Sequence, residues 1–501
     1  MLKNRNGNII SRFFKATAAF WIAAVDCQLF VILTAVALLA ILPLFKTGLN
    51  DTANIIFNII IFCTAAIAGF LAFKLKGSQM AAFTFAAALV FRLCLVLVLE
   101  NSTPFIRDDV RTKTAPWIRH YDTALFQADE FFYVYQGQRY SDVTISEFMN
   151  LPEFTDNAYR AGFLMSKILK FFGDEFIWPR IVGAFLGAFA AAFVCLTAQE
   201  FFSKENSAIV SLLCVIAPQT AFYSVRFLKE IWIIFAASMM VFGFMLIIRN
   251  KKPVAAVLSI TAAAITLGWF RFEYGLMFLA ALPVAICFRR KSSPVGKIIA
   301  ITLMILLGVI IFSYQFNQLT RKAGNLFDRY TLTERGQRGK LEAIEVMDKI
   351  YKSHGPLRLL NVPLSLLNPP PKDLHHIYSE ENKLYDIVLL ANIYQWWIPL
   401  PFLITGAIVI IVKRAEFLAF LLPYLVATGT SALLLGGLQS NLLRYRDSLA
   451  PIAFLVIGVG IDSFLTIPKS WKNKVVIAVY AVFVICAVFV LPVVYFYTRN
   501  F

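Results

Sequence analysis

Long apolar runs recur along the whole chain and are separated by short polar connections. Runs of this length can cross roughly 30 Å of hydrocarbon as α-helices, and their number excludes an ordinary soluble protein. We therefore predict an all-α fold, a polytopic membrane helix bundle of about thirteen transmembrane helices. The predicted spans cover about residues 28–45, 53–73, 80–99, 177–199, 206–224, 231–248, 254–270, 274–288, 298–316, 392–412, 416–435, 449–465 and 475–497.

Basic residues indicate which side of the membrane each connection faces. Lys and Arg are concentrated at the N-terminus and in most short connections, and cytoplasmic loops carry this excess. The first three spans then place residues 100–160 outside, and that segment holds six basic and ten acidic residues. A second long polar segment, 317–386, also falls outside. We predict one membrane domain over residues 1–501 with these two outer-face loop insertions.

Composition limits the classes of partner and site. The 501 residues are 59% hydrophobic and 15% charged, with a formal net charge of +17. Such a charge suggests nucleic acid in a soluble protein, but here the loops account for it, so we predict a lipid bilayer as partner and no nucleic acid. The seven cysteines lie in or beside apolar runs, without the spacing of a disulfide framework or a zinc site.

The polar segment 100–160 contains the candidate catalytic stretch. On a helix, four of its side chains would share one side at i, i+4, i+7 and i+11: Asp129, Tyr133, Gln136 and Tyr140. Glu130 would be rotated about 100° away, so that one carboxylate faces a site and the other faces water. We predict Asp129 and Glu130 as catalytic residues and Tyr133 in the substrate pocket. The competing interpretation is an amphipathic helix that simply lies among the lipid headgroups.

Three predicted outer turns carry Arg and Lys on the side where the charge rule disfavours them. We name them the Arg226 turn (226–230), the Arg271 turn (271–273) and the Arg444 turn (444–447). Cations at the headgroup level bind phosphate, and Arg can do so with two parallel hydrogen bonds. The predicted phosphate ligands are Arg226, Lys229, Arg444, Arg446 and Arg92, the last of which stands inside a span.

The acidic and aromatic members of these turns are assigned to the same predicted site. Glu230, Arg271, Glu273 and Tyr445 are predicted to line the substrate pocket. The alternative is that Arg226 or Lys229 pairs with Glu230, and Arg271 with Glu273, as interfacial salt bridges or as anchors that extend to the headgroups.

Short motifs follow one another on the predicted outer side. In chain order they are Asp129-Glu130-Phe131-Phe132-Tyr133, Pro218 with Tyr223-Ser224 and Lys229-Glu230, Arg271-Phe272-Glu273-Tyr274-Gly275-Leu276, and Arg444-Tyr445 followed by Pro451. Over about residues 80–465 this series resembles the C-type (GT-C) superfamily of integral-membrane glycosyltransferases. That superfamily includes protein O-mannosyltransferases, lipid A aminoarabinose transferases and lipopolysaccharide sugar transferases.

The resemblance implies a multi-pass protein of the bacterial cytoplasmic (inner) membrane with its active site on the outer face. It implies a polyprenyl-phosphate-linked sugar donor and a glycan, lipid or protein acceptor. The chain departs from the family pattern because two spans precede the one that normally opens the fold. It also lacks an Asp-x-Asp in its first outer loop, so a divalent cation stays open as a cofactor and no other cofactor is predicted.

Two other functions remain open from the sequence. A surface-polysaccharide polymerase or ligase would use a lipid-diphosphate oligosaccharide at a similar site. A lipid-linked glycan transporter or flippase would show paired halves and charges at mid-membrane, whereas the ionisable residues here gather at one rim and no internal symmetry is visible.

Overall fold

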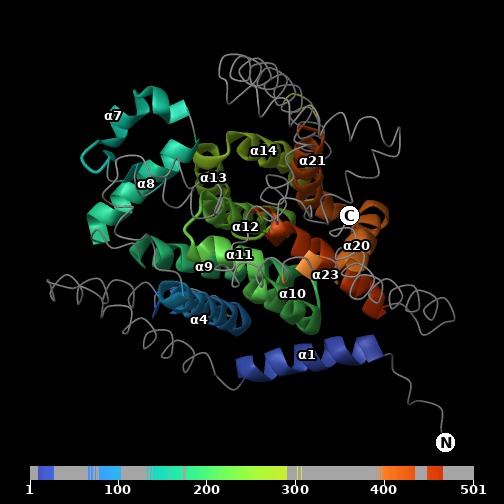
Figure 1. Cartoon of the computed structure of the whole chain (residues 1–501). Helices are drawn as coiled ribbons and strands as arrows, with labels where there is room; N and C mark the ends of the chain where they lie inside the picture. The colour runs from blue at the N-terminus through green and yellow to red at the C-terminus, as the bar shows by residue number, and fades with distance from the viewer. Residues whose placement is uncertain are drawn as a thin grey trace, which may run out of the picture.

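The computed structural model (Figure 1) describes residues 9–26, 78–102, 140–155, 157–172, 177–289, 398–434 and 448–466, with single positions at 66, 67, 69–71, 74, 133, 136, 137, 139, 302, 306, 391, 395 and 396. All elements in this part of the chain are helices. They are α1 (Ile9–Asp26), α4 (Gln79–Ser102), α7 (Ile145–Met149), η3 (Pro152–Thr155), α8 (Asn157–Phe172), α9 (Ile177–Phe201), α10 (Lys204–Ile216), α11 (Pro218–Val225), α12 (Lys229–Ile248), α13 (Pro253–Phe270), α14 (Phe272–Cys287), α20 (Leu400–Val412), η5 (Ala415–Phe417), α21 (Leu418–Leu434) and α23 (Ala450–Thr466).

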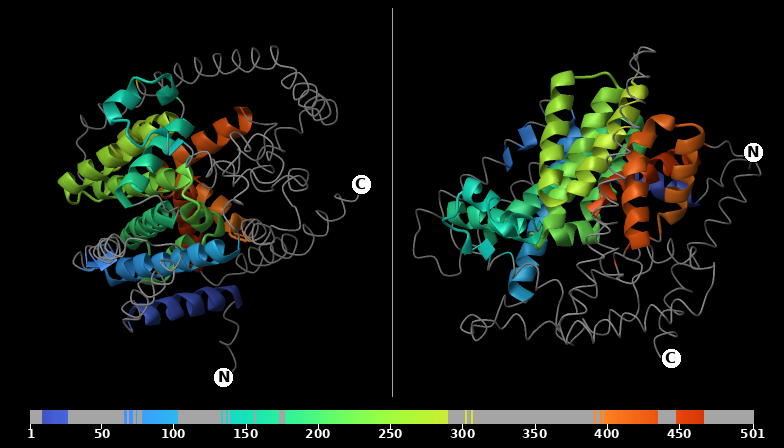
Figure 2. Two further views of the ribbon diagram at one scale, coloured as in Figure 1. Left: turned by 60° about the vertical axis from the view of Figure 1, so that its left-hand side comes forward. Right: turned by 90° about the horizontal axis from the view of Figure 1, so that it is seen from above.

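Four of these helices are long and apolar enough to cross a membrane: α4, α9, α12 and α13. They coincide with predicted spans, so the helical membrane character is confirmed. The count of about thirteen spans stays a prediction, and the predicted spans 28–45 and 475–497 lie outside the described residues. In Figure 2, α12, α13 and α14 pack side by side, with α20, α21 and α23 next to them.

Helix α9 is at the centre of the described bundle, because α4, α10, α11 and α12 all pack against it. Its Gly183 and Gly187 are four residues apart and therefore lie on one face. A Cβ atom at Gly183 would collide with the backbone carbonyl of Ser224 in α11, and one at Gly187 with the side chains of Arg92 and Ser224. Small residues of this kind let membrane helices approach closely enough for packing and hydrogen bonds to hold them together.

The predicted single span 206–224 is wrong in detail, because the chain forms two helices there. Helix α10 ends at Ile216, and α11 begins at Pro218 after Ala217 with φ −52° and ψ 105°. Proline cannot donate a backbone hydrogen bond, and it disfavours helical geometry in the residue before it. The break therefore follows from Pro218, which hydropathy alone does not detect.

Helix α1 was not among the predicted elements. One face of it is buried through Ala18, Trp21 and Val25, and Trp21 contacts Phe83 of α4 edge to face, with ring centroids 4.8 Å apart. The charged residues within this stretch interrupt its hydropathy, so a search for long apolar runs passes over an amphipathic helix.

The helix ends that the charge rule assigns to the cytoplasmic side do meet at one end of the bundle. Ser78 Oγ, just before α4, donates to Gln199 Oε1 of α9 at 2.5 Å. Glu200 accepts from Lys251 Nζ at 2.7 Å through its carboxylate and from Arg249 Nη2 at 2.6 Å through its main-chain carbonyl. The opposite ends of α9 and α12 must then lie together, and the start of α12 carries part of the predicted site.

Gly183 provides a test of the packing around α9. Gly183→Ala places a methyl group against the backbone of Ser224, which cannot rotate away, so we expect a loss of about 1–3 kcal/mol in the free energy of unfolding. Thermal unfolding of the protein in detergent measures it as a lower Tm.

The matched control is Gly268→Ala in α13, where a Cβ meets no atom within 4 Å. This variant should keep or slightly raise the Tm, since alanine is favoured over glycine within a helix. Equal melting temperatures for Gly183→Ala and the unmodified protein would contradict the packing described.

Candidate functional site

Two of the three predicted outer turns meet at one end of the bundle, and the N-terminal half of α8 connects them. Lys229 Nζ of the Arg226 turn donates to Asn157 Oδ1 of α8 at 3.0 Å. One helical turn further along α8, Arg160 Nη1 donates to the carbonyl of Gly268, just before the Arg271 turn, at 3.3 Å. Residues separated by 72 and 108 positions in the chain are therefore held on one helix.

Aromatic rings pack these two turns against each other. Trp232 in the first turn of α12 stacks on Phe270 at the end of α13, with ring centroids 5.7 Å apart. The ring of Trp232 also contacts that of Phe227 edge to face, with centroids 6.1 Å apart. Trp269 contacts the ring of Phe154 in η3 at 5.6 Å. These ring contacts join the end of α13 to the first turn of α12 and to η3.

The Arg226 turn has an unusual backbone. Leu228 N donates to Tyr223 O and Phe227 N donates to Ser224 O, both at 3.3 Å, which is the hydrogen-bond pattern of a Schellman turn. Its left-handed residue, usually glycine, is here Phe227 with φ 48°. Arg226 precedes it, is only 6% exposed and has its guanidinium carbon 5.3 Å from the centre of the Phe222 ring.

Glu230 and Arg271 are also buried, whereas Glu273 is half-buried and Phe272 is exposed. Glu230 is fully buried in the first turn of α12, where the helix dipole favours a negative charge. Arg271 Nη1 lies 3.8 Å from Glu273 Oε1, so the predicted alternative of an ion pair within the Arg271 turn is observed. The guanidinium of Arg271 also lies 5.9 Å from the centre of the Tyr274 ring.

Arg92 lies deeper, between α4, α9, α10 and α11, and is fully buried. Its Nε donates to Ser224 Oγ at 3.2 Å, and its Nη2 donates to the carbonyl of Cys214 at 3.4 Å. The guanidinium is therefore bound to protein acceptors directly beneath the Arg226 turn. Its predicted contact with a phosphate stays a prediction.

The stretch that follows the predicted catalytic carboxylates packs on α8. Tyr133, Gln136 and Tyr140 are buried while Arg139 is exposed, so these three share one side, as the helical spacing predicted. Gly137 and Gly162 make the close approach possible, because a Cβ at Gly162 would collide with Gln136. Asp129, Glu130, Arg444, Tyr445 and Arg446 lie outside the described residues, so their predicted roles stay predictions.

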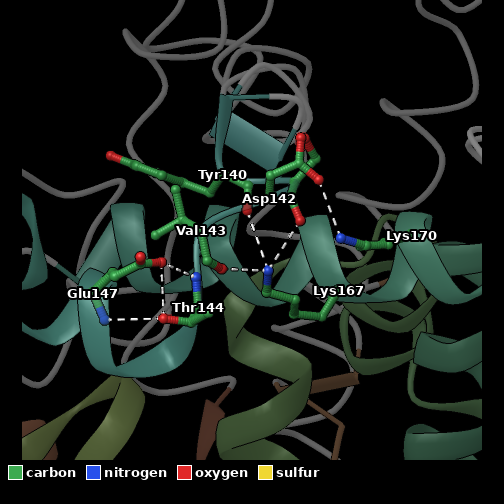
Figure 3. Close-up of polar contacts among 8 residues, drawn as sticks. Tyr140, Asp142, Val143, Thr144, Glu147, Lys167 and Lys170 are labelled. Atoms are coloured by element: carbon green, nitrogen blue, oxygen red, sulfur yellow. Dashed lines mark hydrogen bonds and ion pairs between the residues drawn. The ribbon is translucent and has the colours of Figure 1, made fainter.

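Lys167 of α8 holds the end of this stretch in place (Figure 3). Its Nζ donates to the carbonyls of Tyr140, Ser141 and Val143 at 3.2, 3.1 and 2.6 Å. It also lies 4.8 Å from the centre of the Phe163 ring. Partial burial, followed by repulsion from Lys170, lowers the pKa of Lys167 below its ordinary value.

Two acidic residues of the same loop, Asp142 and Glu147, form local hydrogen bonds. Lys170 Nζ donates to Asp142 Oδ1 at 3.1 Å, and this bond lowers the pKa of Asp142. Thr144 and Glu147 form a capping box at the start of α7, in which the backbone N–H of Thr144 donates to the Glu147 carboxylate at 2.7 Å and lowers its pKa. These acids stabilise local structure.

No group of three or more His, Cys, Asp or Glu side chains that could hold a metal ion occurs among the described residues. No family model, curated protein or solved structure matches this chain.

Asn157, Arg160 and Lys167 were missed by the sequence analysis, although they bring the site together. They stand on one amphipathic helix, α8, between the polar loop and the first span that follows it. Asn157 and Arg160 are 3 residues apart, Arg160 and Lys167 are 7 apart, and Asn157 and Lys167 are 10 apart. This spacing indicates one polar face of an amphipathic helix, but it does not indicate which distant segments that face contacts.

Lys167 and Lys170 form a matched pair of variants. Lys167→Met removes the donor for three carbonyls, so backbone amides over 140–144 should exchange hydrogen at least about tenfold faster, as expected for loss of a charged hydrogen bond. Lys170→Met breaks only an exposed ion pair and should leave that exchange unchanged. Hydrogen exchange with mass spectrometry measures both, and equal effects of the two variants would contradict the role given to Lys167.

Proposed function

We propose that the protein is a membrane glycosyltransferase that moves a sugar from a polyprenyl-phosphate-linked donor to a glycan, lipid or protein acceptor at the outer face of the membrane. The observation that carries the proposal is the joint attachment of the Arg226 turn and the Arg271 turn to α8. It brings cations from distant parts of the chain to one end of the bundle. The stretch that follows Asp129 packs on the same helix. The resemblance of the motifs to the GT-C superfamily adds independent support.

Burial of the cations suits phosphate binding. Arg226 is 6% and Arg271 9% exposed, and Lys229 is half-buried. A charge that is partly shielded from water acts on a bound anion through a lower effective dielectric constant than an exposed one. Donors fixed in advance also require no reorganisation when negative charge develops during a reaction.

The proposed reaction is a single displacement at the anomeric carbon. The acceptor oxygen forms the new bond to that carbon, the bond from carbon to phosphate oxygen breaks, and the lipid phosphate leaves with the electron pair. Asp129 accepts the proton of the acceptor hydroxyl. The acceptor enters opposite the leaving phosphate, so the single displacement inverts the configuration at the anomeric carbon. Because the leaving group is already a stabilised anion, the reaction needs cations on the phosphate more than a strong general acid.

Roles for the other residues follow from this reaction. Arg226 and Lys229, together with Arg444 and Arg446, are proposed to bind the donor phosphate. Tyr133, Glu230, Arg271, Glu273 and Tyr445 are proposed to shape the pocket for the sugar and acceptor, with Glu130 beside the base.

The decisive variant is Asp129→Asn. Loss of a general base should lower the rate of transfer by about 10²–10⁴-fold, measured in membranes supplied with radiolabelled polyprenyl-phosphate sugars. The matched control is Asp142→Asn, which changes an exposed acid in the same loop whose partner is Lys170 and should retain activity. Transfer by Asp129→Asn at the rate of the unmodified protein would rule out this base.

A further inference from the structure

Arg92 satisfies backbone groups at the break between α10 and α11. Its Nη2 donates to the carbonyl of Cys214 at 3.4 Å, and its Nη1 donates to the carbonyls of Val215 at 3.5 Å and Ala88 at 3.1 Å. Its Nε donates to the hydroxyl of Ser224 in α11 at 3.2 Å. One fully buried guanidinium therefore joins α4 to both helices at the break.

The break explains why these carbonyls accept from a side chain. In a continuous helix the carbonyl of residue 214 accepts from the backbone nitrogen of residue 218, and Pro218 has no hydrogen there. The chain also leaves helical geometry at Ala217, which removes the normal donor for Val215. In an apolar bundle such groups need a partner from within the protein, and Arg supplies up to five donors.

The helix that Arg92 holds ends in the strained Arg226 turn. Ser224 Oγ both accepts from Arg92 and donates to the carbonyl of Thr220 at 2.8 Å, and its main chain lies in the turn that contains Phe227 with φ 48°. A bulky residue persists in that conformation only where its surroundings hold it. At the other end of α12 the same kind of turn has Asn250 with φ 54°, a residue type that adopts this conformation readily.

We infer that Arg92 is a positioning residue. It fixes the α10–α11 break and, through Ser224, holds the Arg226 turn in the conformation that presents Arg226 and Lys229, and it acts on a bound phosphate only through that turn. The inference rests on the proposed function in one respect, namely that the turn binds a lipid phosphate. The positioning of the turn can be measured without any activity.

Hydrogen exchange of the full chain in lipid nanodiscs tests the positioning. Arg92→Met should accelerate exchange of the amides of Phe227 and Leu228 by roughly ten- to a hundredfold, the expected consequence of losing a hydrogen bond from a charged donor. Arg92→Lys, which keeps a donor with fewer hydrogens, should have an intermediate effect, and Ser224→Ala should also accelerate exchange.

Two references separate a local effect from general loss of folding. The turn at 246–252, which contains Asn250, should exchange equally in all variants. Thr84→Val changes a buried hydroxyl about two turns before Arg92 on α4, which donates to the carbonyl of Met80 at 2.7 Å and also contacts Cys195 of α9, and it should leave the Arg226 turn unaffected. The inference is overturned if Arg92→Met leaves exchange of the Arg226 turn unchanged, or accelerates both turns equally.

A double-mutant cycle tests whether Arg92 acts through the turn. Binding of a long-chain polyprenyl phosphate is measured for Arg92→Met, for the turn variant Arg226→Met/Lys229→Met and for the variant that combines all three changes. If Arg92 acts through the turn, the combined variant binds little more weakly than the turn variant alone, whereas the losses multiply if Arg92 contacts the phosphate independently.

Multiplying losses would overturn the positioning role. If the unmodified protein does not bind the phosphate at all, the proposed function fails in that form, and the exchange experiment alone still decides whether Arg92 positions the turn.

Discussion

A backbone carbonyl that loses its helical donor inside an apolar bundle must find another one, and much of the described structure follows from this requirement. Pro218 removes the donor for Cys214, and Arg92 of another helix replaces it. The guanidinium fits only because Gly187 of a third helix has no side chain, since a Cβ there would collide with Arg92. A proline, an arginine and a glycine on α11, α4 and α9 therefore work as one unit, and each would be destabilising without the other two.

The same kind of bond recurs at the rim of the bundle. Arg160 donates to the carbonyl of Gly268, and Lys167 donates to three carbonyls that follow Arg139. A main-chain carbonyl can hold a cation in place without cancelling its charge, as a carboxylate would. Positioning by carbonyls thus preserves a positive electrostatic potential near the site, and such a potential attracts an anionic substrate.

Helix α8 decides which residues belong to the site. Its Asn157 and Arg160 bind the two outer turns, and its Gly162 receives the stretch that contains Tyr133 and Tyr140. The close packing on this side combines an aromatic layer around Trp269 with glycine contacts between helices. Polar contacts alone would leave long side chains such as those of Arg160 and Lys229 free to reorient, whereas the packed aromatic layer limits them to one arrangement.

The amino-acid sequence by itself determined where apolar helices lie and which of their ends carry charge. Length and hydropathy are properties of a single segment, so α4, α9, α12 and α13 could be predicted within a few residues. Because the chain reverses direction at each span, the sequence also predicted that the Arg226 turn and the Arg271 turn lie at the same end of the bundle. The helical period likewise placed Tyr133, Gln136 and Tyr140 on one side. Pro218 marked the break in the predicted span 206–224, although hydropathy did not register it.

Only the tertiary structure decided which segments are neighbours. Between apolar helices in lipid there is little hydrophobic preference for one partner over another, so small residues and a few hydrogen bonds make the choice. These depend on contacts such as Lys229 with Asn157 and Arg92 with Ser224, 72 and 132 residues apart. Neither residue of such a pair identifies the other in the sequence, because the chain between them can fold back in many ways that bury the same apolar surface.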